Sequence, residues 1–434
     1  MFALIAALAA TSYVMTVILM SIATLAALSK PFAQEVAFVR NIHIMLDILA
    51  STVAEIPLHL LVLKLLKIKV ASFFGAFNYT LAWLAYFIDV ACIVGLVLLF
   101  IESMREQEVV EEAIKDLTGG EPADPVESIL SVPYIKRVFH FFWSPEDVIL
   151  HPNITYATNE ESAEAIASTN DYDQPRRMAL DIFKSSKAPA STGLRPVLVH
   201  IHGGAWRMGD KNFFYPHEKM LINEDNWIVV NIGYRLAPKN AYPTHLIDIK
   251  RSLRWVKRTI RMFGGDPDFI VLSGDSAGGH LASMAAITAN DPQYQPGFED
   301  VDTSVKGVIS INGVLDLMHS PAYADWFSTK VAMKDKIDTD LLRAHSPADA
   351  LHHCKGTMVP HLVVAGERDL IVDVSQAERF KASYDEAAGE KNSQCTLLKL
   401  PGAHHICHMS WSPRAFYLSR MIQVWCRHIY AKGK

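Results

Sequence analysis

The stretch Phe269–Ala285, FIVLSGDSAGGHLASMA, joins an apolar run to a run of small residues that favour a helix. Between the two runs stands Gly274-Asp275-Ser276-Ala277-Gly278, the only Gly-x-Ser-x-Gly pentapeptide of the sequence. A strand, a sharp turn and a helix form the context in which this pattern makes a nucleophile elbow, with the serine hydroxyl exposed above the sheet edge. We therefore predict that Ser276 is a nucleophile and not the serine of an ordinary turn.

A serine hydroxyl is a weak nucleophile unless a base takes its proton and a carboxylate orients that base. The loop after the last apolar strand, LPGAHHICH, offers His404 and His405. The Gly-x-x-His arrangement favours His405 as the general base and leaves His404 as the alternative. The carboxylate is predicted to be Asp369, which leads the loop after the strand HLVVAG; Glu367 and Asp373 lie nearby.

Acyl transfer also needs donors for the negative charge that develops on the substrate oxygen. The segment His202-Gly203-Gly204-Ala205 follows the strand RPVLVHI, and its small residues let backbone N–H groups approach a carbonyl. We predict an oxyanion hole made by Gly203, Gly204 and Ala205 together with the N–H of Ala277. His202 is expected to orient this loop, and Trp206 to pack beside the acyl pocket.

Short apolar runs alternate with longer amphipathic stretches through the C-terminal two thirds of the chain. Residues 242–265 have apolar side chains at helical spacing and end in a Gly-Gly pair. Strands that alternate with helices predict an α/β fold with a mostly parallel sheet covered on both faces. The expected strands are residues 195–203, 226–234, 269–274, 305–313, 360–367 and 395–402.

The N-terminal part has the composition of a membrane region. Residues 1–29 carry no charged side chain, and a helix of about 20 apolar residues crosses a bilayer. A second apolar segment, residues 79–101, contains only one charge, Asp89. Residues 41–69 are apolar but interrupted by two acidic residues, including Asp47, and a proline, which fits either a third span or an amphipathic helix at the interface. We expect Asp47 and Asp89 to be hydrogen-bonded within this helical anchor.

These segments predict a membrane region with two or three helices over residues 1–104, an acidic linker over 105–125 and a catalytic domain over 126–434. A net charge of −5 without a basic tract argues against nucleic acid as a partner. The five cysteines are scattered and do not form a disulfide framework. The histidine-rich runs 404–408 and 352–354 lack the spacing of a zinc motif, so we expect neither metal nor cofactor.

Several segments together resemble a known family: HGGAW, GYRLAP, FGGDPDFIVLSGDSAGGHLA, GERDLIVDVSQAERF and PGAHH. They look like the hormone-sensitive-lipase and feruloyl-esterase-like branch of the α/β-hydrolases, over roughly residues 153–429, with MALDIFK similar to an early strand of that family. The resemblance implies carboxylic ester hydrolysis through an acyl-enzyme, with Ser276, Asp369 and His405 as the triad. The chain departs from the commoner pattern at Ala205, where a third glycine is usual, and after the histidine pair, where Ile406-Cys407 replace Gly-Phe.

The expected function is a membrane-anchored serine carboxylesterase or lipase, an enzyme located in the membrane that acts on ester or lipid substrates. Some mycobacterial-type membrane esterases and the plant prenylcysteine methylesterases look like this arrangement. A prenylcysteine methylesterase-like or formamidase-like hydrolase is the enzymatic alternative, and a non-catalytic hydrolase fold is a third hypothesis. The sequence leaves open the substrate, the oligomeric state, the side of the membrane that faces the catalytic domain and glycosylation at Asn153.

Overall fold

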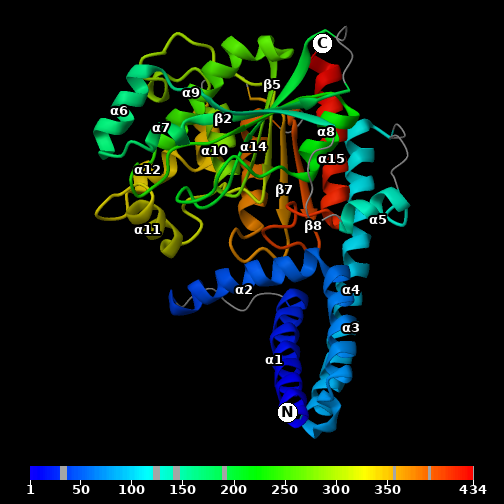
Figure 1. Cartoon of the computed structure of the whole chain (residues 1–434). Helices are drawn as coiled ribbons and strands as arrows, with labels where there is room; N and C mark the ends of the chain where they lie inside the picture. The colour runs from blue at the N-terminus through cyan, green and yellow to red at the C-terminus, as the bar shows by residue number, and fades with distance from the viewer. Residues whose placement is uncertain are drawn as a thin grey trace.

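A single mixed sheet forms the centre of the globular part (Figure 1). The computed structural model describes residues 1–29, 37–120, 128–139, 147–187, 193–354, 358–389 and 392–433. The eight strands lie in the order β1-β2-β4-β3-β5-β6-β7-β8. Their bounds are β1 Val148–Thr155, β2 Ala179–Ser185, β3 Arg195–Ile201, β4 Ile228–Ile232, β5 Gly265–Asp275, β6 Gly307–Ile311, β7 His361–Gly366 and β8 Cys395–Leu400.

The direction of the strands confirms the mostly parallel sheet. Strands β4, β3, β5, β6, β7 and β8 are parallel to one another, whereas β2 is antiparallel to both β1 and β4. The six strands expected from apolar runs are all present, and MALDIFK covers all of β2 except its last residue. Strand β1 was not predicted, because it lies at the sheet edge and its side chains are mostly exposed, which leaves no apolar run to detect it.

Helices cover both faces of the sheet, and the residues of each strand alternate between them. Apolar residues of α9, α10 and α14 pack on one face, and those of α8 and α15 pack on the other. The expected helix at 242–265 is α9 followed by a short 3-10 turn. The helices of the globular part are α5 Val132–Phe139, α6 Asn159–Thr169, α7 Gln174–Arg177, α8 Pro216–Glu224, α9 Thr244–Thr259, α10 Ala277–Ile287, α11 Pro321–Lys330, α12 Thr339–Ala344, α13 Pro347–Ala350, α14 Ser375–Ala388 and α15 Pro413–Gly433.

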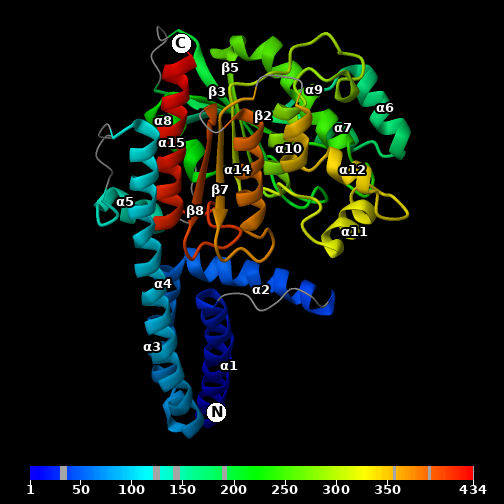
Figure 2. The same cartoon turned by 180° about the vertical axis from the view of Figure 1, so that it is seen from behind.

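Four N-terminal helices form a bundle that projects from the globular part (Figures 1 and 2). They are α1 Phe2–Leu28, α2 Ala37–Glu55, α3 Pro57–Phe73 and α4 Thr80–Thr118. Helices α1, α3 and α4 run alongside one another, and α2 lies across their upper ends beneath the sheet. Among the described residues, α1 and α4 are long and apolar enough to cross a membrane, and α2 and α3, bent by 85° at their junction, count as a third candidate if taken as one span.

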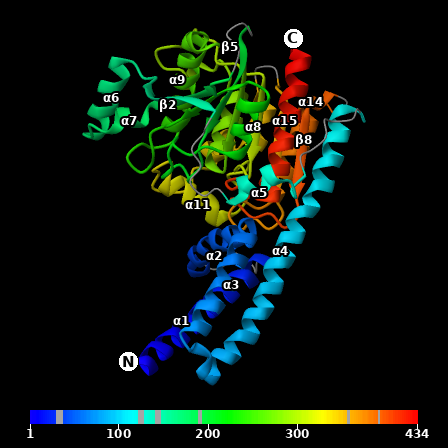
Figure 3. The same cartoon turned by 45° about the vertical axis from the view of Figure 1, so that its right-hand side comes forward.

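The acidic segment after the second apolar run differs from the expected linker. Helix α4 continues without a break from the apolar residues through the acidic ones to Thr118, and Gly119 ends it with a φ of +67°. Val110 and Ile114 of this part are buried in the same core as α15, so the helix packs on the globular domain (Figure 3). The expected boundary at residues 104 and 105 therefore falls inside one continuous helix.

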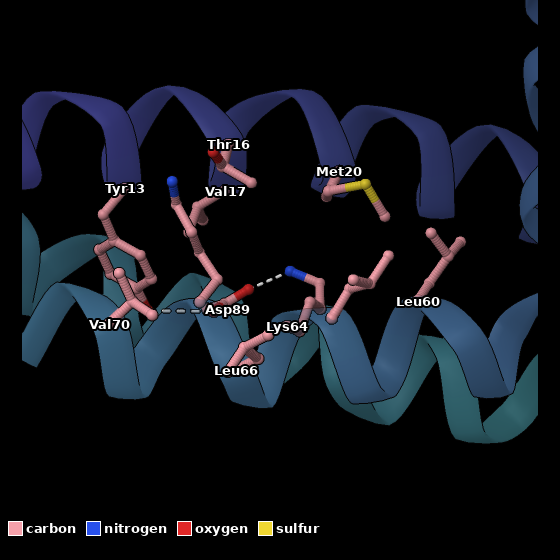
Figure 4. A pocket seen from close by; sticks show the side chains of 11 residues that line it. Tyr13, Thr16, Val17, Met20, Leu60, Lys64, Leu66, Val70 and Asp89 are labelled. Atoms are coloured by element: carbon pink, nitrogen blue, oxygen red, sulfur yellow. Dashed lines mark hydrogen bonds and ion pairs between the residues drawn. The ribbon is translucent and has the colours of Figure 1, made fainter.

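A buried polar group lies among the apolar side chains of the bundle. Lys64 of α3 forms an ion pair with Asp89 of α4, and the Tyr13 hydroxyl of α1 donates to the second oxygen of the same carboxylate at 3.0 Å (Figure 4). Each of the three helices thus contributes one polar side chain. Asp89 is hydrogen-bonded within the helical bundle, as we expected. Removing one partner of a buried ion pair costs roughly 3–5 kcal/mol, because the other charge is left unpaired in an apolar environment. A shift of one helix along the others would break this group, so the group fixes the register of the three helices.

Candidate active site

The elbow at the end of β5 has the strained geometry that the pentapeptide predicts. Ser276 adopts φ +53° and ψ −118°, a conformation that residues other than glycine rarely take. A Cβ on Gly274 would lie 2.3 Å from the Gly278 oxygen, and one on Gly278 would lie 1.9 Å from the Ile201 oxygen, so both positions require glycine. Ser276 is the one residue of the pentapeptide that is not buried.

The acid and base predicted from the sequence are in direct contact. His405 Nδ1 lies 2.6 Å from Asp369 Oδ2, and Asp369 Oδ1 accepts hydrogen bonds from the N–H groups of Ile371 and Val372, both at 2.8 Å. The two residues follow β8 and β7, which are neighbours, so the parallel sheet brings their loops together. Burial by itself lowers the pKa of His405, but the Asp369 carboxylate outweighs it and raises that pKa to about 9.

The other candidate base, His404, has different partners. Its Nδ1 lies 3.3 Å from Asp47 Oδ1, and its Nε2 lies 3.2 Å from the Ala27 carbonyl oxygen. Both ring nitrogens therefore face the N-terminal helices. Of the two histidines, the structure brings only His405 to Asp369.

Asn312 is a site residue that sequence reasoning missed. It follows β6 with a φ of +46°, directly after Ile311, whose oxygen accepts the Ser276 N–H at 3.0 Å. Its side-chain nitrogen donates to the His405 oxygen at 2.6 Å, and its side-chain oxygen accepts from Gly366 at 2.9 Å. Asn312 thus connects the elbow to the loops of the acid and the base. An asparagine before glycine at a strand end was the only available signal.

The loop after β3 lies against the elbow, as predicted for an oxyanion hole. A Cβ on Gly203 would stand 3.1 Å from Ser276 Cβ, and Gly204 and Ala205 have φ values of +113° and +54°. The N–H of Gly203 donates to Asp275 Oδ1 at 3.1 Å, so this group does not point at a substrate. The prediction of Gly203 as an oxyanion donor is therefore corrected. The N–H groups of Gly204, Ala205 and Ala277 stay the candidate donors.

Two aromatic side chains next to this loop have structural partners. His202 stacks on Tyr234 with ring centroids 4.4 Å apart, and its Nδ1 lies 2.7 Å from the Gly203 oxygen, which fits a role in orienting the loop. Trp206 is buried between α10 and α11, in contact with His280 and Phe327 at centroid distances of 5.0 and 4.9 Å.

The N-terminal helices contact the loops that carry the acid and the base (Figures 1 and 2). Asp47 of α2 accepts a hydrogen bond from the N–H of Leu370, the residue after Asp369, at 3.1 Å. Arg368, the residue before it, makes two hydrogen bonds of 2.8 Å to Glu102 of α4. We expected Asp47 to be bonded within the anchor; its partners beyond Ser51 lie in the globular domain instead, because α2 turns across the bundle and meets these loops.

A second contact joins the anchor to the last helix. Arg414 of α15 is fully buried and pairs with both Glu55 of α2 and Glu106 of α4, and the Ser412 hydroxyl also donates to Glu55. These contacts and those of Asp47 and Arg368 make one continuous interface. The candidate catalytic loops therefore lie between the sheet and the N-terminal helices.

Comparison with known proteins agrees with this geometry. Residues 180–384 match the model of the BD-FAE family. The chain is 36% identical over 246 residues to the probable carboxylic ester hydrolase LipM of Mycobacterium tuberculosis, covering 55% of this chain and 56% of LipM. It is 34% identical over 264 residues to the esterase LipQ of the same organism, covering 59% and 61%. The chain thus spans little more than half the length of these relatives.

Solved structures show the same fold. Esterase B from Lactobacillus rhamnosis superposes with a TM-score of 0.55 and 20% identity, covering 76% of this chain and 98% of that protein. A thermophilic esterase from Thermogutta terrifontis reaches a TM-score of 0.50 with 18% identity, covering 67% and 94%. The globular part of the chain thus has the α/β-hydrolase fold of these esterases, and its residues 180–384 are similar to the BD-FAE family.

Proposed function

We propose that this protein is a membrane-anchored serine carboxylic ester hydrolase. The observation that carries the proposal is the strained, accessible Ser276 at the end of β5, with the His405–Asp369 pair on the neighbouring strand ends. The esterases LipM and LipQ support it through the part of the chain that they share.

The reaction follows from the roles of these groups. Ser276 Oγ attacks the ester carbonyl carbon while His405 takes its proton through Nε2, since Nδ1 is bonded to Asp369. The N–H groups of Gly204, Ala205 and Ala277 stabilise the oxyanion, where one donor contributes about 10²–10³-fold in rate. His405 then gives the proton to the leaving alcohol, and a water molecule activated by His405 cleaves the acyl-serine to release the acid.

We infer that the anchor crosses the membrane three times. The end of α1 touches the globular domain, since Arg368 donates to the Ala27 oxygen at 3.2 Å. The start of α4 lies at the opposite end of the bundle, where the Tyr79 hydroxyl donates to the Ala3 oxygen at 3.2 Å. If α1 and α4 both cross, α3 must return the chain from the domain side to the far side, so it crosses as well.

The orientation follows from the basic residues near the far end. Lys67 and Lys69 of α3 lie towards the turn that leads into α4. Under the positive-inside rule this end is cytoplasmic, and the hydrolase domain lies on the other side of the membrane. Protease protection in sealed vesicles tests this: the domain is expected to be cleaved from the non-cytoplasmic side only.

The substrate class that we propose is a lipidic ester present in the membrane. The contact of the acid and base loops with α2 and α4 supports this, because it puts the site next to the lipid phase. A methyl ester of a prenylated cysteine or an amide is the alternative. The amide is supported by the arylacetamide deacetylase of Mus musculus, which is 38% identical over 182 residues, 37% of this chain and 44% of that protein.

Labelling with a fluorophosphonate probe tests the central claim. The full-length protein in detergent is expected to be labelled and to hydrolyse p-nitrophenyl esters, and Ser276→Ala is expected to lose both. Ser283→Ala is a matched control, since Ser283 is a buried serine of α10, the helix that follows Ser276. Labelling that persists in Ser276→Ala, or a wild type without turnover, refutes the proposal. A series of acyl chain lengths, with a prenylcysteine methyl ester and an anilide, then separates the substrate classes.

A further inference from the structure

A buried group of metal-type donors lies behind the elbow, between β3 and α8. His200 comes from β3, and His217 and Glu218 come from the first turn of α8. Each side chain is at most 1% exposed, and one donor atom from each lies within 4.8 Å of the others. Among the residues that the structure describes, no other set of His, Cys, Asp and Glu has this arrangement.

Each side chain of this group has one polar atom without a hydrogen-bond partner among the described residues. These atoms are His200 Nε2, His217 Nε2 and Glu218 Oε1. His200 Nδ1 lies 3.9 Å from Glu218 Oε1 and 3.2 Å from the Ser273 hydroxyl. Buried polar atoms are nearly always satisfied, so several unsatisfied atoms in one place indicate a missing ligand.

The second nitrogen of His200 has the environment that a metal-bound histidine needs. His200 Nε2 makes no hydrogen bond among the described residues, but it lies 3.4 Å from Asp275 Oδ1, on the opposite side of the ring from Glu218. Metal-ligating histidines usually direct their other ring N–H at a carboxylate or a carbonyl, which fixes the ring orientation. His200 can therefore bind an ion through Nδ1 while Asp275 orients it.

The charges around the group also call for a cation. Glu218 Oε2 accepts from the Tyr215 N–H and from Asn231, and Asp275 accepts from Gly203 and the Tyr215 hydroxyl. Among the described residues, no lysine or arginine pairs with either carboxylate. Buried carboxylates are normally paired or bound to a metal, and a divalent ion would balance both of them.

We propose that His200, His217 and Glu218 bind one divalent transition-metal ion of the zinc class. Two imidazoles and one carboxylate are a donor set that zinc accepts. The site is buried and does not include Ser276, so its role is structural: it ties α8 to β3 and, through His200 and Asp275, to the elbow. We expected no metal from the sequence, and these three residues gave no signal there because they come from two separated segments without a metal motif.

Cobalt titration of the full-length protein in detergent tests the site without relying on catalysis. After removal of metal with a chelator, one Co²⁺ per chain is expected to bind with the visible d–d absorption of a low-coordinate nitrogen–oxygen site, and Zn²⁺ is expected to displace it. A wild type that binds no stoichiometric Co²⁺ or Zn²⁺ overturns the proposal and leaves buried water or a shared proton as the occupant.

Variants assign the ligands. Glu218→Gln, which keeps the shape of the side chain, and His217→Leu are each expected to weaken binding by at least about 100-fold. The control is His352→Ala with His353→Ala, a histidine pair in a separate surface hollow beside Arg379. Binding that survives both ligand substitutions overturns the assignment, and so does a loss in the control alone. If His217→Leu does not fold, the wild-type spectrum and Glu218→Gln still decide.

The result is independent of the proposed function. The metal-free wild type, if folded, is expected to keep the reaction of Ser276 with a fluorophosphonate, since no ligand lies in the catalytic group. A chain that is labelled but binds no metal refutes the metal site alone. A chain that binds metal but is not labelled refutes the esterase alone.

Discussion

Replacing Asp47 tests whether the N-terminal helices position the proposed catalytic groups. Asp47 is fully buried, and its Oδ1 accepts the Leu370 N–H at 3.1 Å and faces His404 Nδ1 at 3.3 Å. Leu370 directly follows the candidate acid Asp369. Asp47→Ala removes the carboxylate that accepts from the part-buried Leu370 N–H and faces the buried His404 ring, so both candidate catalytic loops lose a contact with α2.

The size of the effect follows from these two groups. A buried donor left unsatisfied costs about 1–3 kcal/mol. If the loop of Asp369 shifts to find another partner, the active arrangement becomes less stable by this free energy. A difference of about 1.4 kcal/mol corresponds to a tenfold change in rate. We expect kcat of Asp47→Ala to fall by roughly 10–100-fold with a smaller change in KM, since Asp47 does not touch the substrate.

The charge of Asp47 gives a second readout. Its carboxylate is one of the groups that raise the pKa of His405, after Asp369. Protonated His405 cannot accept the proton of Ser276, so kcat/KM rises as the pH rises through this pKa. Asp47→Asn keeps an acceptor for Leu370 but removes the charge, so we expect it to recover most of kcat and to move the inflection to lower pH.

The assay is hydrolysis of a soluble p-nitrophenyl ester by full-length protein in detergent, over a range of pH. Thr52→Ala is the matched control, because Thr52 lies on the exposed side of the same helix. Wild-type kcat and an unchanged pH profile in Asp47→Ala would refute the role of the anchor in positioning the acid loop. Equal losses in Asp47→Ala and Thr52→Ala would assign the effect to general damage of α2.

Three further substitutions test other parts of the structure. Arg414→Met leaves two buried carboxylates without their cation, and thermal unfolding should show a loss of about 3–5 kcal/mol. Gly278→Ala puts a Cβ 1.9 Å from a backbone oxygen and should lower the free energy of unfolding by about 3 kcal/mol or more. Its control is Gly297→Ala, which has a φ of +81° but open space around it and should cost about 1 kcal/mol. Equal losses of stability in the two variants would contradict the steric argument. Asp369→Asn should lower kcat by about 10³–10⁴-fold and move the pH inflection of the residual activity down, because Asp369 is what raises the pKa of His405; an unchanged inflection would exclude this pair.

Local patterns predicted the elbow and the strand ends correctly. The run from Phe269 to Ala285 carries its own information: apolar residues for a buried strand, glycines where the backbone is crowded, and small residues for a helix. The same holds for the loops of Asp369 and His405, since parallel strands end at one edge of the sheet. Chain order and the ends of the strands were therefore enough to predict that Asp369 and His405 lie close together.

Other features left no trace in the sequence. Strand β1 is exposed at the sheet edge and has no apolar run. We predicted a linker for the acidic part of α4 because its many charged residues outnumber the few apolar ones, such as Val110 and Ile114, that pack in the same core as α15. Asn312 connects the elbow to the base through its side chain, and its sequence neighbours say nothing about that contact.

The sequence by itself determined the hydrolase fold, and it predicted the elbow at Ser276 and the candidate groups beside it, because these depend on local periodicity and on where strands end. Tertiary structure decided which histidine meets Asp369, which N–H of the glycine loop is already bonded, and that Asp47 of α2 contacts the candidate catalytic loops. The contact between Asp47 and Leu370 joins residues 323 positions apart. Such contacts depend on how whole helices dock, and the pattern of neighbouring residues does not encode that direction.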